Sequence, residues 1–143
     1  MNYLIIATIM LLNIIFCEAS EISNKSIQGK SYSNHTNGIY DKTITDEQIE
    51  NFLSKLKLNL KADNSNKLAD MFQYPFNCNS CKKPKIIKSR TQFKNRYKEI
   101  FTKKIREAVS NASLDELFVN YQGFMIGNGE IWFDPKKGIK AIN

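Results

Sequence analysis

The segment from Leu117 to Asn143 constrains the fold of this 143-residue chain more than any other part. It contains Asn128-Gly129, a dipeptide typical of the type I′ β-hairpin turn, in which both central residues need a positive φ. A hairpin closed at this dipeptide pairs Ile126 with Ile131 and extends outward along both strands. The sequence therefore predicts an antiparallel hairpin near the C-terminus.

The predicted hairpin sorts its large side chains into two sets, because side chains alternate between the two faces of a strand. One set is Phe124, Ile126, Ile131 and Phe133, and the other is Val119, Tyr121, Met125 and Trp132. Both sets are rich in large apolar groups, so both faces need cover. We expect a helix on one face and a ligand, a protein partner or another subunit on the other.

The N-terminus has the character of a secretory signal peptide. Residues 1–16 carry no charge and are almost entirely apolar, but a spanning helix needs ~20 residues. The run ends at Cys17-Glu18-Ala19, an A-x-A-like site, which predicts cleavage after Ala19 and export to the periplasm or the medium. Lipid anchoring at Cys17 is less favoured because Phe16 before it is not small, and an uncleaved anchor also stays open.

The mature chain is expected to begin with a flexible leader over residues 20–42, where Ser, Asn, Lys and Gly dominate and few aliphatic residues occur. The only histidine of the chain, His35, falls in this leader and is expected to be a solvated loop residue. The formal net charge of the whole chain is +7. Loss of Glu18 with the signal peptide makes the mature chain still more basic.

Two helices are predicted at the start of the domain that spans residues 43–143. Thr45 and Gln48 form a capping box, and apolar residues then recur at three- and four-residue spacing to about Lys61. A shorter helix is expected over residues 66–72. Pro75 then disfavours helical geometry.

The longest helix is predicted from Ser89, which opens a second capping box with Gln92, to about Ser110. Its apolar stripe is formed by Phe93, Tyr97, Ile100, Phe101, Ile105, Ala108 and Val109. This stripe is suited to cover one face of the C-terminal sheet.

Residues 74–89 are expected to form a strand pair, or a strand with a loop, with Cys78 and Cys81 at the tip. The main expectation is a short structural disulfide, since removal of Cys17 leaves an even count in an exported chain. A redox-active pair is less favoured because Pro84 opposes the helix that normally follows such a motif. No metal is expected, because zinc needs two more ligands.

Short antiparallel strands near residues 118–127, 130–134 and 138–142, preceded by helices, indicate an α+β domain with its helices on one side of the sheet. The order of elements resembles the NTF2-like (cystatin-like or SnoaL-like) superfamily of cone-shaped domains. The segments FKNRYKEIF and LFVNYQGFMIGNGEIWF resemble small exported bacterial proteins of this superfamily, in which a G-x-G-E-I-W block, here residues 127–132, closes the sheet.

The resemblance covers roughly residues 45–143. It implies N-terminal helices and a long helix packed on a curved antiparallel sheet, with a pocket between the sheet and the helices. It implies no single activity, since the superfamily includes enzymes, transport factors and binding proteins.

An enzyme of this fold needs a pocket carboxylate as base and a hydrogen-bond donor opposite it. Glu130 is the candidate base, Tyr121 and Asn120 are candidate donors, and Trp132 with Met125 would wall the pocket. Glu130 beside a turn is more typical of a solvated rim residue. The predicted domain has no histidine, and no Ser-His-Asp set or glycine-rich phosphate loop occurs.

Positive charge is concentrated between Lys82 and Arg106, where eleven basic residues accompany one acidic residue, Glu99. Four of the basic residues lie off the apolar stripe of the predicted helix, namely Arg90, Lys94, Lys98 and Lys104. They form either an ordinary solvated face or a basic surface for an acidic protein, an envelope polymer or membrane headgroups. Nucleic acid is disfavoured by the predicted export and by the lack of a recognised motif.

Taken together, these features favour an exported binding module for an unknown protein or small-molecule ligand, a class that includes inhibitor and immunity proteins. No cofactor is expected. The alternatives are a small-molecule enzyme that uses Glu130 and a CxxC thiol redox protein. A homodimer through the exposed sheet also fits the pattern.

Overall fold

The computed structural model describes residues 40, 41 and 43–143. The predicted signal peptide, Cys17, His35 and most of the leader lie outside these residues. In the described part of the chain, no helix has both the length and the apolar character that crossing a membrane requires.

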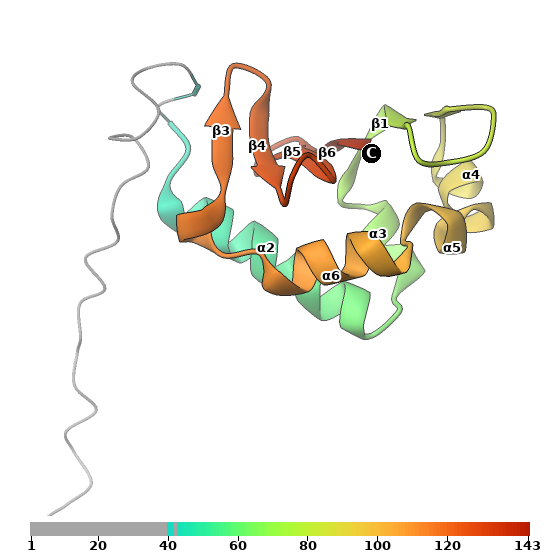
Figure 1. The fold of residues 1–143 in the computed structure, drawn as a ribbon, viewed down its shortest axis with the longest axis horizontal. Coiled ribbons are helices and arrows are strands. Elements are labelled where there is room, and N and C mark those ends of the chain that lie inside the picture. Colours follow the sequence, from blue (N-terminus) through green and yellow to red (C-terminus); the bar gives the residue numbers. More distant parts are fainter. Residues whose placement is uncertain (1–39, 42) are drawn as a thin grey trace, which may run out of the picture.

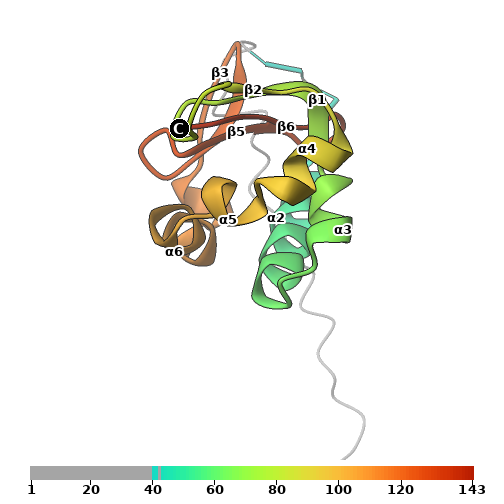
Figure 2. The same cartoon turned by 90° about the vertical axis from the view of Figure 1, so that its right-hand side faces the viewer.

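Five α-helices and a six-stranded sheet make up the described part of the chain, which confirms the predicted α+β class (Figure 1). The helices are α2 (Asp46–Lys61), α3 (Ser65–Ala69), α4 (Arg90–Asn95), α5 (Tyr97–Ile100) and α6 (Lys103–Asn111), with a 3-10 turn η2 (Leu114–Glu116). The strands are β1 (Phe72–Cys78), β2 (Ile86–Ile87), β3 (Phe118–Asn120), β4 (Gly123–Ile126), β5 (Ile131–Asp134) and β6 (Gly138–Ile142). Figure 2 shows the helices on one side of the sheet.

The strand order is β2-β1-β6-β5-β4-β3, and β1 runs parallel to β6. The prediction of an entirely antiparallel sheet is therefore wrong at this one junction. All other neighbours pair antiparallel. Local sequence patterns fix hairpins between consecutive strands, but they carry no information about the pairing of strands that are far apart in the chain.

The predicted hairpin register is confirmed: Ile126 pairs with Ile131, and the two pairs before it also match. The turn differs from type I′, because the positive φ values fall at Gly127 (67°) and Gly129 (106°) and not at Asn128. A four-residue connection, residues 127–130, thus joins the strands. The pairing survives because both connections place Ile126 opposite Ile131.

The expected strand over residues 118–127 is divided by a tight turn at Tyr121 and Gln122. The side-chain oxygen of Asn120 accepts the Gln122 N–H at 2.8 Å, which is the Asx-turn geometry. Gly123 follows with φ of 121°, a value that suits glycine. The chain therefore folds back on itself as β3 and β4.

The prediction of one continuous helix from Ser89 to about Ser110 is also wrong, because three shorter helices, α4, α5 and α6, replace it. Phe101 leaves helical geometry at φ −95° and ψ 68°, and the Thr102 hydroxyl then caps α6 by accepting the Ile105 N–H at 3.4 Å. The bends bring the rings of Phe93 and Phe101 to 4.8 and 6.1 Å from Phe72. Packing of both rings against β1 outweighs the continuity of one helix.

The first helix forms as predicted, with both hydrogen bonds of the Thr45–Gln48 capping box present. The predicted short helix is confirmed as α3, which ends earlier because Phe72 begins β1. The hairpin residues that point toward the helices are almost fully buried, namely Phe124, Ile126, Ile131 and Phe133. One face of the hairpin is therefore covered by helices, as expected.

Candidate functional site

No helix of residues 40, 41 and 43–143 lies over the other face of the sheet (Figure 2). One cross-strand row runs over all six strands on this side, because each residue is the register partner of the next. From β3 to β2 the row is Phe118, Met125, Trp132, Ala141, Asn77 and Ile86. We call this row, with the residues beside it, the outer face.

Large apolar side chains of the outer face are in contact with solvent. Phe118 is 52% exposed and Ile86 is 45% exposed. The Phe118 ring stands edge-on to the indole of Trp132, with ring centroids 6.4 Å apart. Single exposed apolar residues are ordinary, but three large apolar neighbours, Phe118, Met125 and Trp132, are typical of a surface that meets a partner.

A hollow of about 240 Å³ lies in the middle of the outer face. It is lined by Asn77, Gln122, Trp132, Lys140 and Ala141. A register shift between Trp132 and Phe133 marks a bulge against β6, which leaves Lys140 as well as Ala141 at this surface. Among the described residues, Lys140 is the only charged one that lines the hollow.

The predicted pocket set is only partly brought together. Met125 and Trp132 are direct cross-strand partners on the outer face. Tyr121 lies in the β3–β4 turn, 74% exposed, and the Asn120 side chain is used to hold that turn. The expected common face of Tyr121, Trp132 and Glu130 does not form, because the chain turns at Tyr121 and Glu130 belongs to a different groove.

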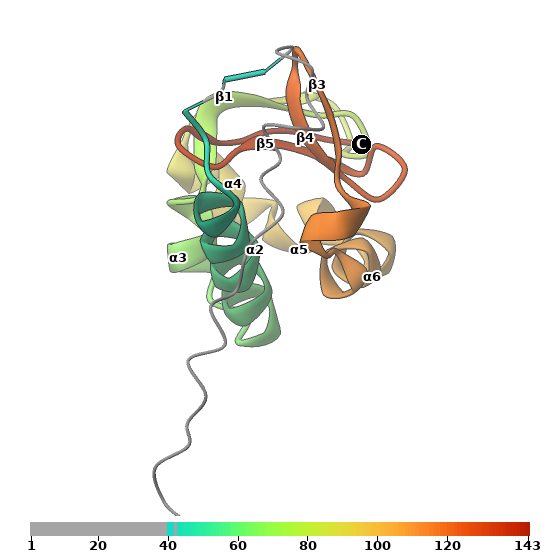
Figure 3. The same ribbon diagram turned by 90° about the vertical axis from the view of Figure 1, so that its left-hand side faces the viewer.

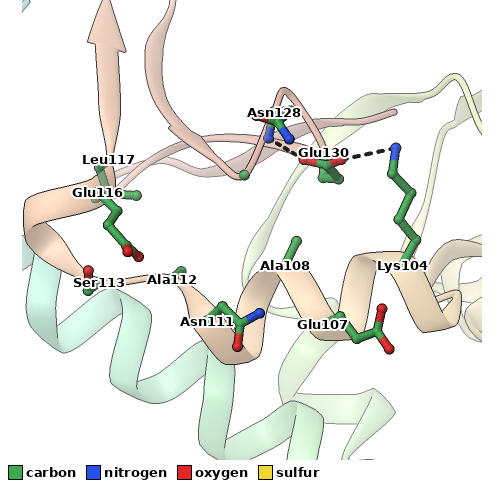
Figure 4. A pocket seen from close by; sticks show the side chains of 11 residues that line it. Lys104, Glu107, Ala108, Asn111, Ala112, Ser113, Glu116, Leu117, Asn128 and Glu130 are labelled. Atoms are coloured by element: carbon green, nitrogen blue, oxygen red, sulfur yellow. Dashed lines mark hydrogen bonds and ion pairs between the residues drawn. The ribbon is translucent and has the colours of Figure 1, made fainter.

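Glu130 lines a groove of about 420 Å³ between α6 and the β4–β5 turn (Figure 4). One carboxylate oxygen lies 3.0 Å from the Lys104 ammonium, and the other accepts the backbone N–H of Asn128. The Glu130 side chain is only 7% exposed, which contradicts the expectation of a solvated rim residue. The remaining lining residues are Glu107, Ala108, Asn111, Ala112, Ser113, Glu116, Leu117 and Gly127.

These contacts make Glu130 a poor general base. The Lys104 ammonium, aided by the Asn128 N–H, outweighs the effect of burial and holds the pKa of the Glu130 carboxyl below its ordinary value. A general base works best when its pKa lies near the working pH. The same carboxylate occupies the place that a Cβ at Gly127 would take, so its geometry is that of a residue that closes the turn.

The four cations of the predicted basic surface have different surroundings. Arg90 forms an ion pair with Asp70 and also donates to the carbonyl of Asn66. Lys104 pairs with Glu130 as described. Lys94 and Lys98 are exposed on α4 and α5. The predicted surface is therefore interrupted by internal ion pairs and by the bends between these helices.

The CxxC motif lies at the end of β1, where the tip of the strand pair was predicted. Cys78 and Cys81 lie at disulfide-bonding distance, with their Cα atoms 5.3 Å apart, and both are almost fully buried. Arg96 fastens the following loop to the helices by donating to the carbonyls of Lys82 and Pro84. Reactive thiol pairs are usually accessible, so this burial favours a structural role over redox chemistry.

Sequence reasoning missed three residues of the outer face: Phe118, Ile86 and Lys140. The exposed position of Phe118 was predictable from the sequence. A third strand paired antiparallel to β4 places Phe118 opposite Met125. Ile86 requires the parallel β1–β6 pairing, and Lys140 requires the bulge. Neither feature has a local signal in the sequence.

A group of three or more His, Cys, Asp or Glu side chains arranged to hold a metal ion does not occur among residues 40, 41 and 43–143. In comparisons with known proteins, no protein-family model, curated protein or solved structure matches this chain.

Proposed function

We propose that this chain is an exported binding module of the NTF2-like superfamily that recognises an acidic partner protein through the outer face of its sheet. Inhibitor and immunity roles fall within this class. The observation that carries the proposal is the apolar row of Phe118, Met125 and Trp132 on the side of the sheet that the helices leave uncovered.

The order of elements supports the superfamily. Helices, a strand pair, further helices and an antiparallel meander follow one another in this order along the chain. The block Gly127–Trp132 forms the β4–β5 connection and the start of β5.

The chemistry of the outer face suits a protein partner. Aromatic side chains supply large contact area at low cost in conformational entropy, and they are enriched among residues that dominate binding energy. Phe118 and Trp132 stand together at one end of the row, beside the hollow that Trp132 and Lys140 line. A partner side chain that enters this hollow would contact both apolar and polar groups.

The net charge of the chain favours an acidic protein over a second copy as the partner. The chain carries a formal net charge of +7, and Lys140 is the only charged residue in the row and its hollow. A second copy of the chain would bring an equally basic molecule against this face, and their mutual repulsion would oppose pairing. An acidic protein is instead attracted to the basic chain, and this attraction also speeds association.

Export rests on the signal-peptide pattern and needs its own test. We expect the protein recovered from outside the cytoplasm to begin at Ser20, as measured by the intact mass of the purified chain. Recovery of a chain that still begins at Met1, or of one acylated at Cys17, would contradict cleavage after Ala19.

Site-specific crosslinking tests the binding surface in cells that make the protein. A photoreactive residue at position 118 should yield one crosslinked partner with an acidic composition, and the same group at position 94 on α4 should not. The purified partner should then bind the mature chain, and Trp132→Ser should weaken that complex about tenfold or more. Crosslinks to a second copy alone, or a complex insensitive to Trp132→Ser, would overturn the proposal.

The enzyme alternative depends on Glu130, whose lowered pKa and internal ion pair disfavour it. The redox alternative depends on the two cysteines, whose burial disfavours it.

A further inference from the structure

A second open groove lies between α2 and α6, on the helical side of the domain and away from the outer face. Figures 2 and 3 show these helices as two ridges on the same side of the sheet. The groove has a volume of about 360 Å³. Its lining residues are Lys57, Leu60, Lys61, Arg106, Val109 and Ser110.

The floor of this groove is apolar and its walls are positively charged. Leu60 and Val109 lie at the base of the groove and are almost fully buried. Most of the exposed apolar lining therefore comes from the aliphatic stems of Lys57, Lys61 and Arg106, which also bring three cations. None of the lining residues is acidic.

Backbone carbonyls hold two of the cations in place. The Lys57 ammonium donates to the carbonyl of Ala112 at 2.6 Å, which ties α2 to the end of α6. The Arg106 guanidinium donates to the carbonyls of Phe101 and Leu60 at 3.1 and 3.2 Å. A carbonyl orients a cation but does not neutralise it, so the positive charge persists at the groove.

One carboxylate reduces this charge. Asp63 pairs with Arg106 at 2.7 Å. Neither Lys57 nor Lys61 forms an ion pair with a carboxylate elsewhere in the described part of the chain. The groove therefore keeps a positive charge above an apolar floor, a combination that matches a partner with an apolar stripe between acidic residues.

We infer that the α2–α6 groove binds an acidic amphipathic helix of a partner protein. A helix laid between two helical ridges can place its apolar face on the floor and its flanking carboxylates against the lysines. Leu58, which is 68% exposed, precedes Lys61 by three residues and extends the apolar surface at the margin of the groove. This inference does not depend on the outer face and can hold or fail separately from it.

The test uses the mature chain, residues 20–143, and two synthetic helical peptides of about 18 residues. Both peptides carry leucine at i, i+3, i+4 and i+7 spacing, and the remaining positions are mainly Glu in one peptide and mainly Lys in the other. In NMR titrations the Glu peptide should shift the backbone amide signals of Lys61 and Ser110, and its affinity should fall as salt rises. The Lys peptide should not bind.

Two variants with the same change in net charge locate the site. Lys61→Glu should weaken binding of the Glu peptide about tenfold, whereas Lys94→Glu on α4 should change it less than about twofold. Lys61→Gln should fall between the two, and Trp132→Ser should have no effect. Thermal melts confirm that each variant is folded.

The proposal is overturned if the Glu peptide does not bind, if both peptides bind equally, or if Lys94→Glu weakens binding as much as Lys61→Glu. Titration with dodecanoate tests whether the groove instead binds a small anionic amphiphile, which also combines an apolar part with a negative charge. Dodecanoate binding at Lys61 without binding of the Glu peptide would assign the groove to an anionic amphiphile and contradict a helix.

Discussion

The rings of Phe52 on α2 and Phe133 on β5 stack face to face, with centroids 4.6 Å apart and planes 5° apart. The contact packs the first helix of the domain, α2, against the inner face of the C-terminal hairpin. Since neighbouring residues of a strand point to opposite faces, Trp132 beside Phe133 points away from the helices. The same strand thus supplies both the core and the surface that we propose for binding.

Replacing Phe133 by Ala should destabilise the domain by about 3–5 kcal/mol, because it removes a buried ring and leaves a cavity. Chemical denaturation of the mature chain measures this loss. The control is Leu58→Ala on α2, where an exposed side chain is removed and the change should stay within about 0.5 kcal/mol. Similar losses for the two variants would contradict the position of Phe133 in the core.

Stability should fall in acid because of Glu130 and Asp134. The pKa of Glu130 is lowered by Lys104 as described. Burial raises the pKa of Asp134, but hydrogen bonds from the Tyr40 hydroxyl and from the N–H groups of Lys136 and Lys137 outweigh burial and lower it overall. Both groups therefore bind protons more weakly in the folded state than in the unfolded chain.

A lowered carboxyl pKa stabilises the fold above the unfolded value, and the stabilisation disappears as pH falls through the folded value. We expect the melting temperature to change little from these groups down to about pH 5 and to fall below it. Glu130→Gln and Asp134→Asn should each flatten the acid limb of the profile. An acid limb unchanged in both variants would remove these carboxylates from the account.

Glu130→Ala also tests whether this carboxylate serves structure or catalysis. It removes the carboxylate that accepts the Asn128 N–H in a part-buried hydrogen bond, and a hydrogen bond to a charged group contributes about 1.5–3 kcal/mol. If Glu130 has a structural role, Glu130→Ala should lower the melting temperature and leave binding at the proposed outer-face site unchanged. An unchanged melting temperature, together with the loss of a measured turnover, would instead support the enzyme alternative.

The two cysteines of the mature chain should resist reduction. Cys78 and Cys81 are almost fully buried, so a mild dithiol should expose no thiol in the native protein and both thiols after unfolding, as counted by thiol titration. Replacing both by Ser should cost about 2 kcal/mol, the entropy of a short closed loop. Rapid reduction of the native protein would favour the redox alternative.

Local chemistry made much of the fold predictable. Thr45 caps α2 because its hydroxyl accepts the Gln48 N–H while the side-chain oxygen of Gln48 accepts the Thr45 N–H. The Ile126–Ile131 register follows from the position of the Asn-Gly dipeptide and from strand alternation. Each of these features is decided by residues that are close together in the chain.

Features that depend on distant contacts were not predictable. The break at Phe101 and Thr102 is stabilised by packing of Phe101 against Phe72 on β1, and no local breaker residue marks it. The burial of Glu130 depends on Lys104 reaching it from α6. Its charge and its place beside a turn predict exposure. Sequence patterns therefore group Glu130 with Trp132, although the two residues line different hollows of the structure.

Fluorescence of Trp132 reports on the proposed binding surface, because Trp132 is the only tryptophan of the chain and lies on the outer face. Titration of residues 20–143 with the protein captured by crosslinking at position 118, made free of tryptophan, should shift the emission to shorter wavelength as the indole loses contact with water. Phe118→Ser should weaken the transition about tenfold, and raised salt should weaken it as well. A complex that forms with no change in Trp132 emission would contradict binding at the outer face.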